Sequence, residues 1–217
     1  MSRRWVVEVD RHMAHEYQFR PWFLNNWMRA GLIVAVVTLA LLPVLWNTAD
    51  HSLLLILTLL PVYMIHQYEE HAHGRFVADF NTTIGKGLPV LTKTSAFAIN
   101  VGGVWLLDLP AFYLAAYVDL GFALIPAYLM TVNAVVHVLG TLATRRYNPG
   151  LYTALALFIP WGVFMTVFIS ARTSNALAFN IFGLVVALAI HAGIVIFALR
   201  RRRELTASAQ SFVRAAQ

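Results

Sequence analysis

The sequence predicts an all-α, polytopic membrane protein in which six transmembrane helices form one bundle, with both termini in the cytoplasm. The chain is 59% hydrophobic and only 12% charged, whereas soluble domains contain about 45–50% apolar and about 25% charged residues. Six apolar stretches each approach the roughly 20 residues that a spanning helix needs. With six spans, every basic residue except Arg172 falls on the same side of the membrane.

The spans are expected, in chain order, at residues 29–46, 52–71, 95–117, 120–144, 151–170 and 176–199. The third span contains Asp108 and Pro110, and the proline predicts a kink because it cannot donate a helical hydrogen bond. The connection over residues 75–94 is long enough to lie along the interface or to act as a lid. In the next cytoplasmic connection, Asn148 is expected to cap the fifth span and Pro149 to be its first helical residue.

The charge distribution sets the orientation of these spans. Arginine and lysine residues occur before the first span, between the second and third, between the fourth and fifth, and after the sixth. Basic residues prefer the cytoplasmic side, which places the chain in the cytoplasmic (inner) membrane. The chain then divides into an N-terminal interfacial segment, 1–28, a six-helix domain, 29–200, and a basic tail, 201–217. The net charge of +6 does not indicate nucleic-acid binding, because the basic residues flank apolar stretches.

A polar run at the end of the second span is the strongest functional signal. His66, Glu69, Glu70 and His73 directly follow an almost wholly apolar stretch. Their spacing of three, four and seven residues places them on one face of a helix, while His71 would point elsewhere. Ionisable groups at membrane depth are costly and usually mark a functional site.

Other spans bring polar residues to the same depth. His137 lies near the end of the fourth span, with Asn133 one turn earlier, and His191 lies near the end of the sixth. The second, fourth and sixth spans all end at the cytoplasm, and the third, which carries Asn100, begins there. These residues are therefore expected to share one site in the cytoplasmic third of the bilayer.

The pattern resembles the HXXEE domain family of small integral membrane proteins. The resemblance rests on His66, Glu69 and Glu70, and extends to His137, to the segment 146–150 and to His191. It covers most of the chain from about residue 53 to about residue 199. It implies a membrane location and a candidate site, but it implies no particular reaction.

A single metal ion is the leading interpretation of the site. Histidine and carboxylate side chains suit zinc, iron or manganese, and the expected ligand pool is His66, Glu70, His73, His137 and His191. Glu69 is expected to act as a general base, with Asn100, Asn133 and Tyr63 hydrogen-bonding the ligands. The function that follows is a metal-dependent membrane enzyme that acts on a lipid-like or other apolar substrate, by hydrolysis or related acid/base chemistry.

Two other interpretations remain open. A proton-coupled transporter would use the histidines and glutamates as a relay, with Asp108 and Asn180 continuing it in the outer half. A non-catalytic membrane protein would use the same groups only for structure, with the carboxylates paired to Arg75 or Arg145. The absence of cysteine excludes disulfides and thiolate ligands.

Overall fold

The computed structural model describes the backbone of residues 3–215 and the side chains of residues 22–211. All regular elements in this part of the chain are helices, which confirms the all-α prediction. Six helices are long and apolar enough to cross a membrane, at Trp22–Leu45, His51–Thr83, Lys93–Tyr117, Leu120–Thr144, Leu151–Ser170 and Ala176–Ser211. The side on which the termini lie stays a prediction. The predicted segments 1–28 and 201–217 extend partly outside the described residues.

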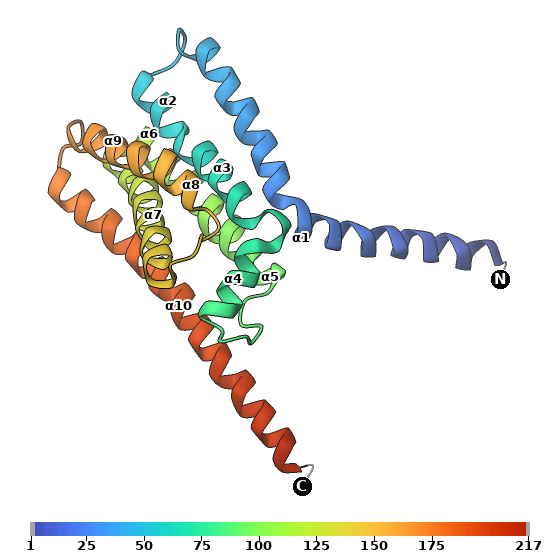
Figure 1. Cartoon of the computed structure of the whole chain (residues 1–217). Coiled ribbons are helices and arrows are strands. Elements are labelled where there is room, and N and C mark those ends of the chain that lie inside the picture. The colour runs from blue at the N-terminus through green and yellow to red at the C-terminus, as the bar shows by residue number, and fades with distance from the viewer. Residues whose placement is uncertain (1–2, 216–217) are drawn as a thin grey trace.

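Several spans are built from more than one helical element (Figure 1). The first is part of α1 (Arg3–Leu45), and the second joins α2 (His51–Leu57), α3 (Leu59–His71), the 3₁₀ turn η1 (Ala72–Gly74) and α4 (Arg75–Thr83). The third joins α5 (Lys93–Phe97), the π-helical η2 (Ala98–Trp105) and α6 (Leu106–Tyr117). The remaining elements are η3 (Leu120–Ala123), α7 (Leu124–Thr144), α8 (Leu151–Thr153), the π-helical η4 (Ala154–Phe158), α9 (Ile159–Ser170) and α10 (Ala176–Ala215).

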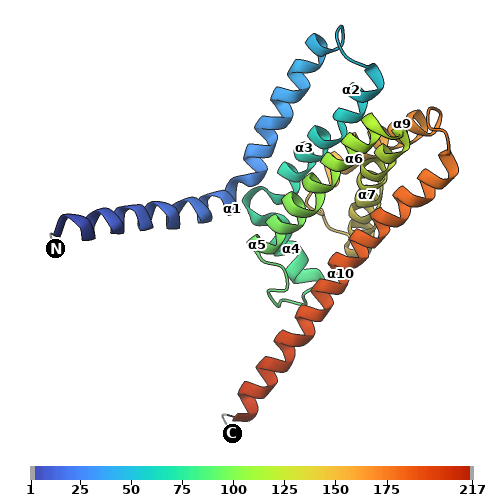
Figure 2. The ribbon, with the colours of Figure 1, turned by 180° about the vertical axis from the view of Figure 1, so that it is seen from behind.

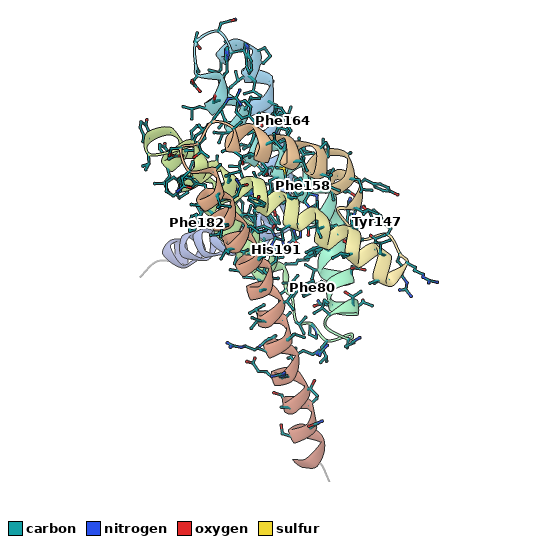
Figure 3. All side chains as sticks on the ribbon, turned by 90° about the vertical axis from the view of Figure 1, so that its left-hand side faces the viewer. Phe80, Tyr147, Phe158, Phe164, Phe182 and His191 are labelled. Carbon is teal, nitrogen blue, oxygen red and sulfur yellow. The ribbon has the colours of Figure 1, made fainter. Side chains whose placement is uncertain are left out.

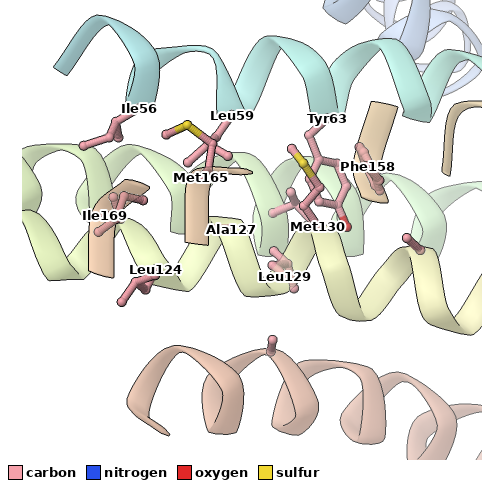
Figure 4. Packing of buried hydrophobic residues seen from close by; sticks show 14 of the residues in the cluster. Ile56, Leu59, Tyr63, Leu124, Ala127, Leu129, Met130, Phe158, Met165 and Ile169 are labelled. Carbon is pink, nitrogen blue, oxygen red and sulfur yellow. The ribbon is translucent and has the colours of Figure 1, made fainter. Parts of the chain in front are cut away.

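The second and fourth spans form the centre of the bundle. Half of the apolar window of each is buried inside the protein, compared with 17% for the first and sixth spans. Figure 4 shows Tyr63, Met130 and Phe158 packed between α3 and α7, in a cluster that continues through Leu59 and Leu129. Side chains on the facing sides of α3 and α7 are therefore removed from both lipid and water.

A proline and a threonine break the second span in its first half. Pro61 has no N–H to donate to the carbonyl of Leu57, so the helix cannot continue regularly there. The Thr58 hydroxyl donates to the Leu55 carbonyl at 2.5 Å and accepts from the Trp161 indole at 2.8 Å. Beyond this break, α3 packs against η4 and α8 of the fifth span.

A second break interrupts this span after α3. Helix α3 stops at His71, because His73 and Gly74 both have left-handed backbones with φ of 62° and 73°. Arg75 then donates to the exposed Glu69 carbonyl at 2.8 Å, which satisfies the end of α3. The chain turns here, and α4 lies with α5 and part of α10 at one end of the bundle (Figure 2). We call this the basic end.

Asp119 organises the opposite end of the bundle. Its carboxylate accepts hydrogen bonds from the hydroxyls of Thr173 and Ser174 and from the Gly121 N–H, so it ties two connecting segments together. These bonds, that from Thr173 foremost, lower the pKa of Asp119 below its usual value. The carboxylate therefore stays charged at neutral pH.

The packing of α10 on α7 generates a prediction for stability. A Cβ atom at Gly183 would lie 2.8 Å from the Leu124 carbonyl oxygen, a backbone atom that cannot move cheaply, whereas a Cβ at Gly102 would meet no atom within 4 Å. Gly183→Ala is expected to lower the free energy of unfolding by about 1–3 kcal/mol, as overpacking does. Gly102→Ala is the matched control and should lower it little. Thermal unfolding in one detergent compares them, and equal melting temperatures would contradict this packing.

Candidate metal centre

Three buried side chains from the two central spans meet near the basic end. His66 and Glu70 on α3 and His137 on α7 are 0%, 4% and 2% exposed. One donor atom from each lies within 4.8 Å of the others. Nε2 of His66 is 3.7 Å from Glu70 Oε2, and Nε2 of His137 is 3.6 Å from Glu70 Oε1. Both distances are longer than a hydrogen bond, so the carboxylate is not hydrogen-bonded to either ring.

The other nitrogen of each ring is held by a hydrogen bond. Nδ1 of His66 is 2.8 Å from the Thr153 hydroxyl. That hydroxyl donates its single hydrogen to Glu69 Oε2 at 2.5 Å, so it must accept from His66. Nδ1 of His137 donates to the amide oxygen of Asn148 at 2.7 Å. In the neutral rings, both protons are therefore on Nδ1, and both Nε2 lone pairs face Glu70.

This arrangement leaves a carboxylate and two lone pairs facing one another with no proton between them. Nε2 of His66 has no hydrogen-bond partner among the described residues. Buried groups of this kind are costly unless a cation lies between them. Metal-binding histidines present a bare nitrogen to the ion and donate the other N–H to the protein. The residues therefore fit a divalent transition metal.

Glu69 points away from this group and caps the fifth span. Its carboxylate accepts from the Tyr147 hydroxyl at 2.6 Å, from the backbone N–H groups of Tyr152 and Thr153 at 3.2 and 2.7 Å, and from the Thr153 hydroxyl. A carboxylate is favourable at a helix N-terminus. Burial and the bond to Glu69 raise the pKa of Tyr147 to about 12, so this hydroxyl keeps its proton. The residue expected as a general base thus has four donors.

The connection before the fifth span approaches the rings closely. Gly150 has a φ of 99° and is the residue that precedes the first turn at Leu151, so the expected cap at Asn148 and helix start at Pro149 are wrong. The Asn148 side chain is committed to His137 instead. A Cβ at position 150 would lie 2.8 Å from Cε1 of His66 and 2.9 Å from Cε1 of His137.

His71 joins the group, although helical spacing predicted that it would point elsewhere. Its Nε2 is 3.1 Å from Glu70 Oε2 and accepts from the Asn100 amide at 3.0 Å. Trp105 donates to Gln67 at 2.7 Å and Gln67 donates to Asn100 at 2.9 Å, and an indole can only donate, so this order is fixed. Glu70 therefore faces three imidazole nitrogens. In the sequence, these contacts were indicated only by the presence of two further polar residues, Gln67 and His71, within an apolar span.

The remaining predicted residues lie around this group or outside it. His73 is exposed in the turn after α3, because that helix ends before it. His191, on α10 (Figure 3), hydrogen-bonds the Ala187 carbonyl of its own helix at 2.8 Å. Asn133 is half-buried one turn before His137, and the Tyr63 ring lies edge-on to His66 with centroids 6.1 Å apart.

Aromatic side chains cover the group. The Phe76 ring of α4 lies 5.1 Å from the His71 ring and 6.4 Å from the His137 ring, measured between centroids. The Phe158 ring lies 4.1 Å from the His66 ring. The connection over residues 75–94, expected as an interfacial piece or a lid, thus places α4 over the group.

Comparison with known proteins gives one match. The model of a family described as a protein of unknown function with an HXXEE motif matches residues 57–165, which is half of the chain. The matched range contains His66, Glu69, Glu70, His137 and Thr153 and ends before His191, so it is narrower than the resemblance expected from the sequence. No curated protein and no solved structure matches the chain.

Gly150 provides a test of the close approach to the rings. Gly150→Ala adds both a left-handed alanine and a collision with His66 and His137, whereas Gly87→Ala adds only the former, at a φ of 87° with no atom within 4 Å. Thermal or denaturant unfolding should show that Gly150→Ala costs about 1–3 kcal/mol more than Gly87→Ala. Equal losses in the two variants would show that residue 150 does not touch the rings.

Proposed function

Because the chain belongs to the HXXEE family, which is described as of unknown function, we propose its function from the site itself: a metal-dependent integral membrane enzyme. His66, Glu70 and His137 would hold one divalent transition metal. The observation that carries this proposal is the convergence of two buried Nε2 lone pairs on one buried carboxylate. A structural role alone does not explain why both rings direct an unprotonated nitrogen at Glu70.

The donor set favours a catalytic site over a structural one. Two imidazoles and one carboxylate suit zinc, iron or manganese. Structural zinc sites usually have four protein ligands, whereas catalytic ones have three and keep a position open. When bound, such a metal supplies Lewis-acid activation of water or substrate. Nε2 of His71 lies on the other side of Glu70, 3.1 Å from Oε2, and it is unprotonated too because it accepts from the Asn100 amide.

Glu69 takes a positioning role in this proposal, in place of the general-base role that its sequence position indicated. Its carboxylate holds the Thr153 hydroxyl, and that hydroxyl holds His66 Nδ1. Asn148 does the same for His137. These outer contacts keep the proton off the two nitrogens that face Glu70.

The surroundings favour an apolar substrate. The three ligands are at most 4% exposed and lie between membrane-spanning helices, under the rings of Phe76 and Phe158. A lipid-like molecule can approach such a site from the bilayer once α4 moves aside, whereas a strongly hydrated one would have to lose its water. Hydrolysis or a related acid/base reaction is the chemistry proposed.

One observation favours a proton relay as the second candidate. Asp108 is 4% exposed, and neither of its carboxylate oxygens has a hydrogen-bond partner among the described residues. It lines a cavity of about 120 Å³ together with Leu59, Leu60 and Phe112. An unpartnered acid at membrane depth is what a relay needs.

The metal content of the purified protein tests the leading proposal. Elemental analysis of the full chain in detergent should find about one transition-metal ion per chain after loading with zinc, iron or manganese. His66→Ala and His137→Ala should lose it. His73→Ala and His191→Ala are matched controls and should keep it, because those two imidazoles lie outside the group.

Two results would overturn the proposal. If the native protein binds none of the three metals, the remaining explanations are a proton relay or a structural polar cluster. Equal loss of metal in all four histidine variants would place the ion elsewhere.

Thr153 tests the role of the outer contacts. Thr153→Val keeps the shape of the side chain but removes the hydroxyl that joins Glu69 to His66. Loss of such an outer contact typically weakens metal binding about 10–100-fold. Thr153→Ser keeps the hydroxyl and should restore affinity to near the native value in a competitive chelator titration. If valine and serine variants bind equally, the hydroxyl does not position His66.

A further inference from the structure

A groove at the basic end of the bundle lies apart from the histidine site. It encloses about 470 Å³ between α10 and the segment that leads into α5. Figures 1 and 2 show both elements at that end of the molecule. The α10 wall of the groove consists of Gly193, Ile196, Phe197, Arg200, Arg201 and Glu204.

The α10 wall changes character along the helix axis. Spacings of three and four residues place these side chains on one helix face. The first half of the wall is apolar, with Ile196 and Phe197 about half exposed, and the second half begins at Arg200. From Gly193 to Arg200 is about 10 Å at 1.5 Å per residue. The groove is therefore apolar toward the membrane interior and cationic toward the interface.

The opposite wall carries both apolar and polar side chains. Val90 is buried and apolar, while Thr92 and Ser95 carry hydroxyls. These two side chains and their backbone form the capping box at the start of α5, which holds this wall in place. Nη1 of Arg201 is 3.4 Å from Oε2 of Glu204, so the Glu204 carboxylate offsets part of the charge of Arg201. Arg200 is then the principal cation of the groove.

Gly193 leaves the apolar half open. A Cβ atom built at this position would meet no atom within 4 Å. A glycine beside free space, on a face that otherwise carries large side chains, leaves room for a narrow hydrocarbon chain.

We infer that this groove binds one anionic glycerophospholipid. Its phosphate would lie at Arg200 and Arg201, and one acyl chain would run along Phe197, Ile196 and Gly193. The match is directional, because a lipid also changes from charged to apolar over a similar length as it enters the bilayer. Arginine pairs well with phosphate oxygens, and basic residues beside spans attract anionic lipids. This binding does not depend on the metal site.

The experiment measures lipid binding by the full chain in nanodiscs or by native mass spectrometry. Phosphatidylglycerol is the probe, and phosphatidylcholine is the zwitterionic comparison. Arg200→Gln should reduce bound phosphatidylglycerol at least fivefold. Arg203→Gln is the matched control, since it removes one charge from the same arginine run but does not line the groove, and it should bind nearly as the native chain does. Equal reductions would mean diffuse attraction and would overturn the inference.

A second variant tests the apolar half without changing charge. Gly193→Leu should fill the groove, abolish retention of phosphatidylglycerol and leave the melting temperature unchanged, because the space is empty. Gly193→Ala should retain the lipid. Displacement of phosphatidylglycerol by inorganic phosphate alone, or full binding by Gly193→Leu, would show that only an anion site exists and would overturn the lipid assignment.

Discussion

The Thr153 hydroxyl is the contact on which the arrangement of the site depends. It donates to Glu69 and accepts from His66, and so it joins two residues of α3 to the first turn of the fifth span. A hydroxyl has only one hydrogen. Because Glu69 takes that hydrogen, His66 must donate from Nδ1, and its other nitrogen has to face Glu70. One connected chain of hydrogen bonds therefore determines the start of the fifth span, the orientation of the His66 ring and the unprotonated state of its Nε2.

The membrane makes such a set stringent. Polar groups in an apolar interior must find partners inside the protein, because water and lipid headgroups are out of reach. Gln67, Asn100 and Trp105 form such a chain of matched donors and acceptors, whereas Glu70 faces three imidazole nitrogens that carry no proton toward it. These polar side chains lie on the second and fourth spans, which have the largest buried fraction, or pack against those spans. Moving any of them to the outer spans would expose it to hydrocarbon.

The sequence predicted the parts of this structure that have a regular pattern. The fourth and fifth spans begin and end where hydropathy placed them, and topology alone brought His66, Glu70 and His137 to one depth. Helical spacing misplaced His73, because α3 ends at His71 and His73 and Gly74 turn left-handed. It also misplaced His71, whose Nε2 lies 3.1 Å from Glu70. The contacts of Thr153 and Asn148 could not be predicted. Each is a single polar residue, one in an apolar span and one in a loop, and neither belongs to a periodic pattern that would indicate its partner.

The bond between Glu69 and Thr153 also has a consequence for the order of synthesis. The two residues are 84 positions apart in the chain. At about 5–20 residues per second, roughly 4–17 s pass between the translation of the glutamate and that of its partner. During this interval the second span has emerged from the ribosome, but the donors for its carboxylate do not yet exist. A nascent chain stopped after four spans would therefore hold a charged helix end with no internal partner, a feature by which an unfinished protein differs from a complete one.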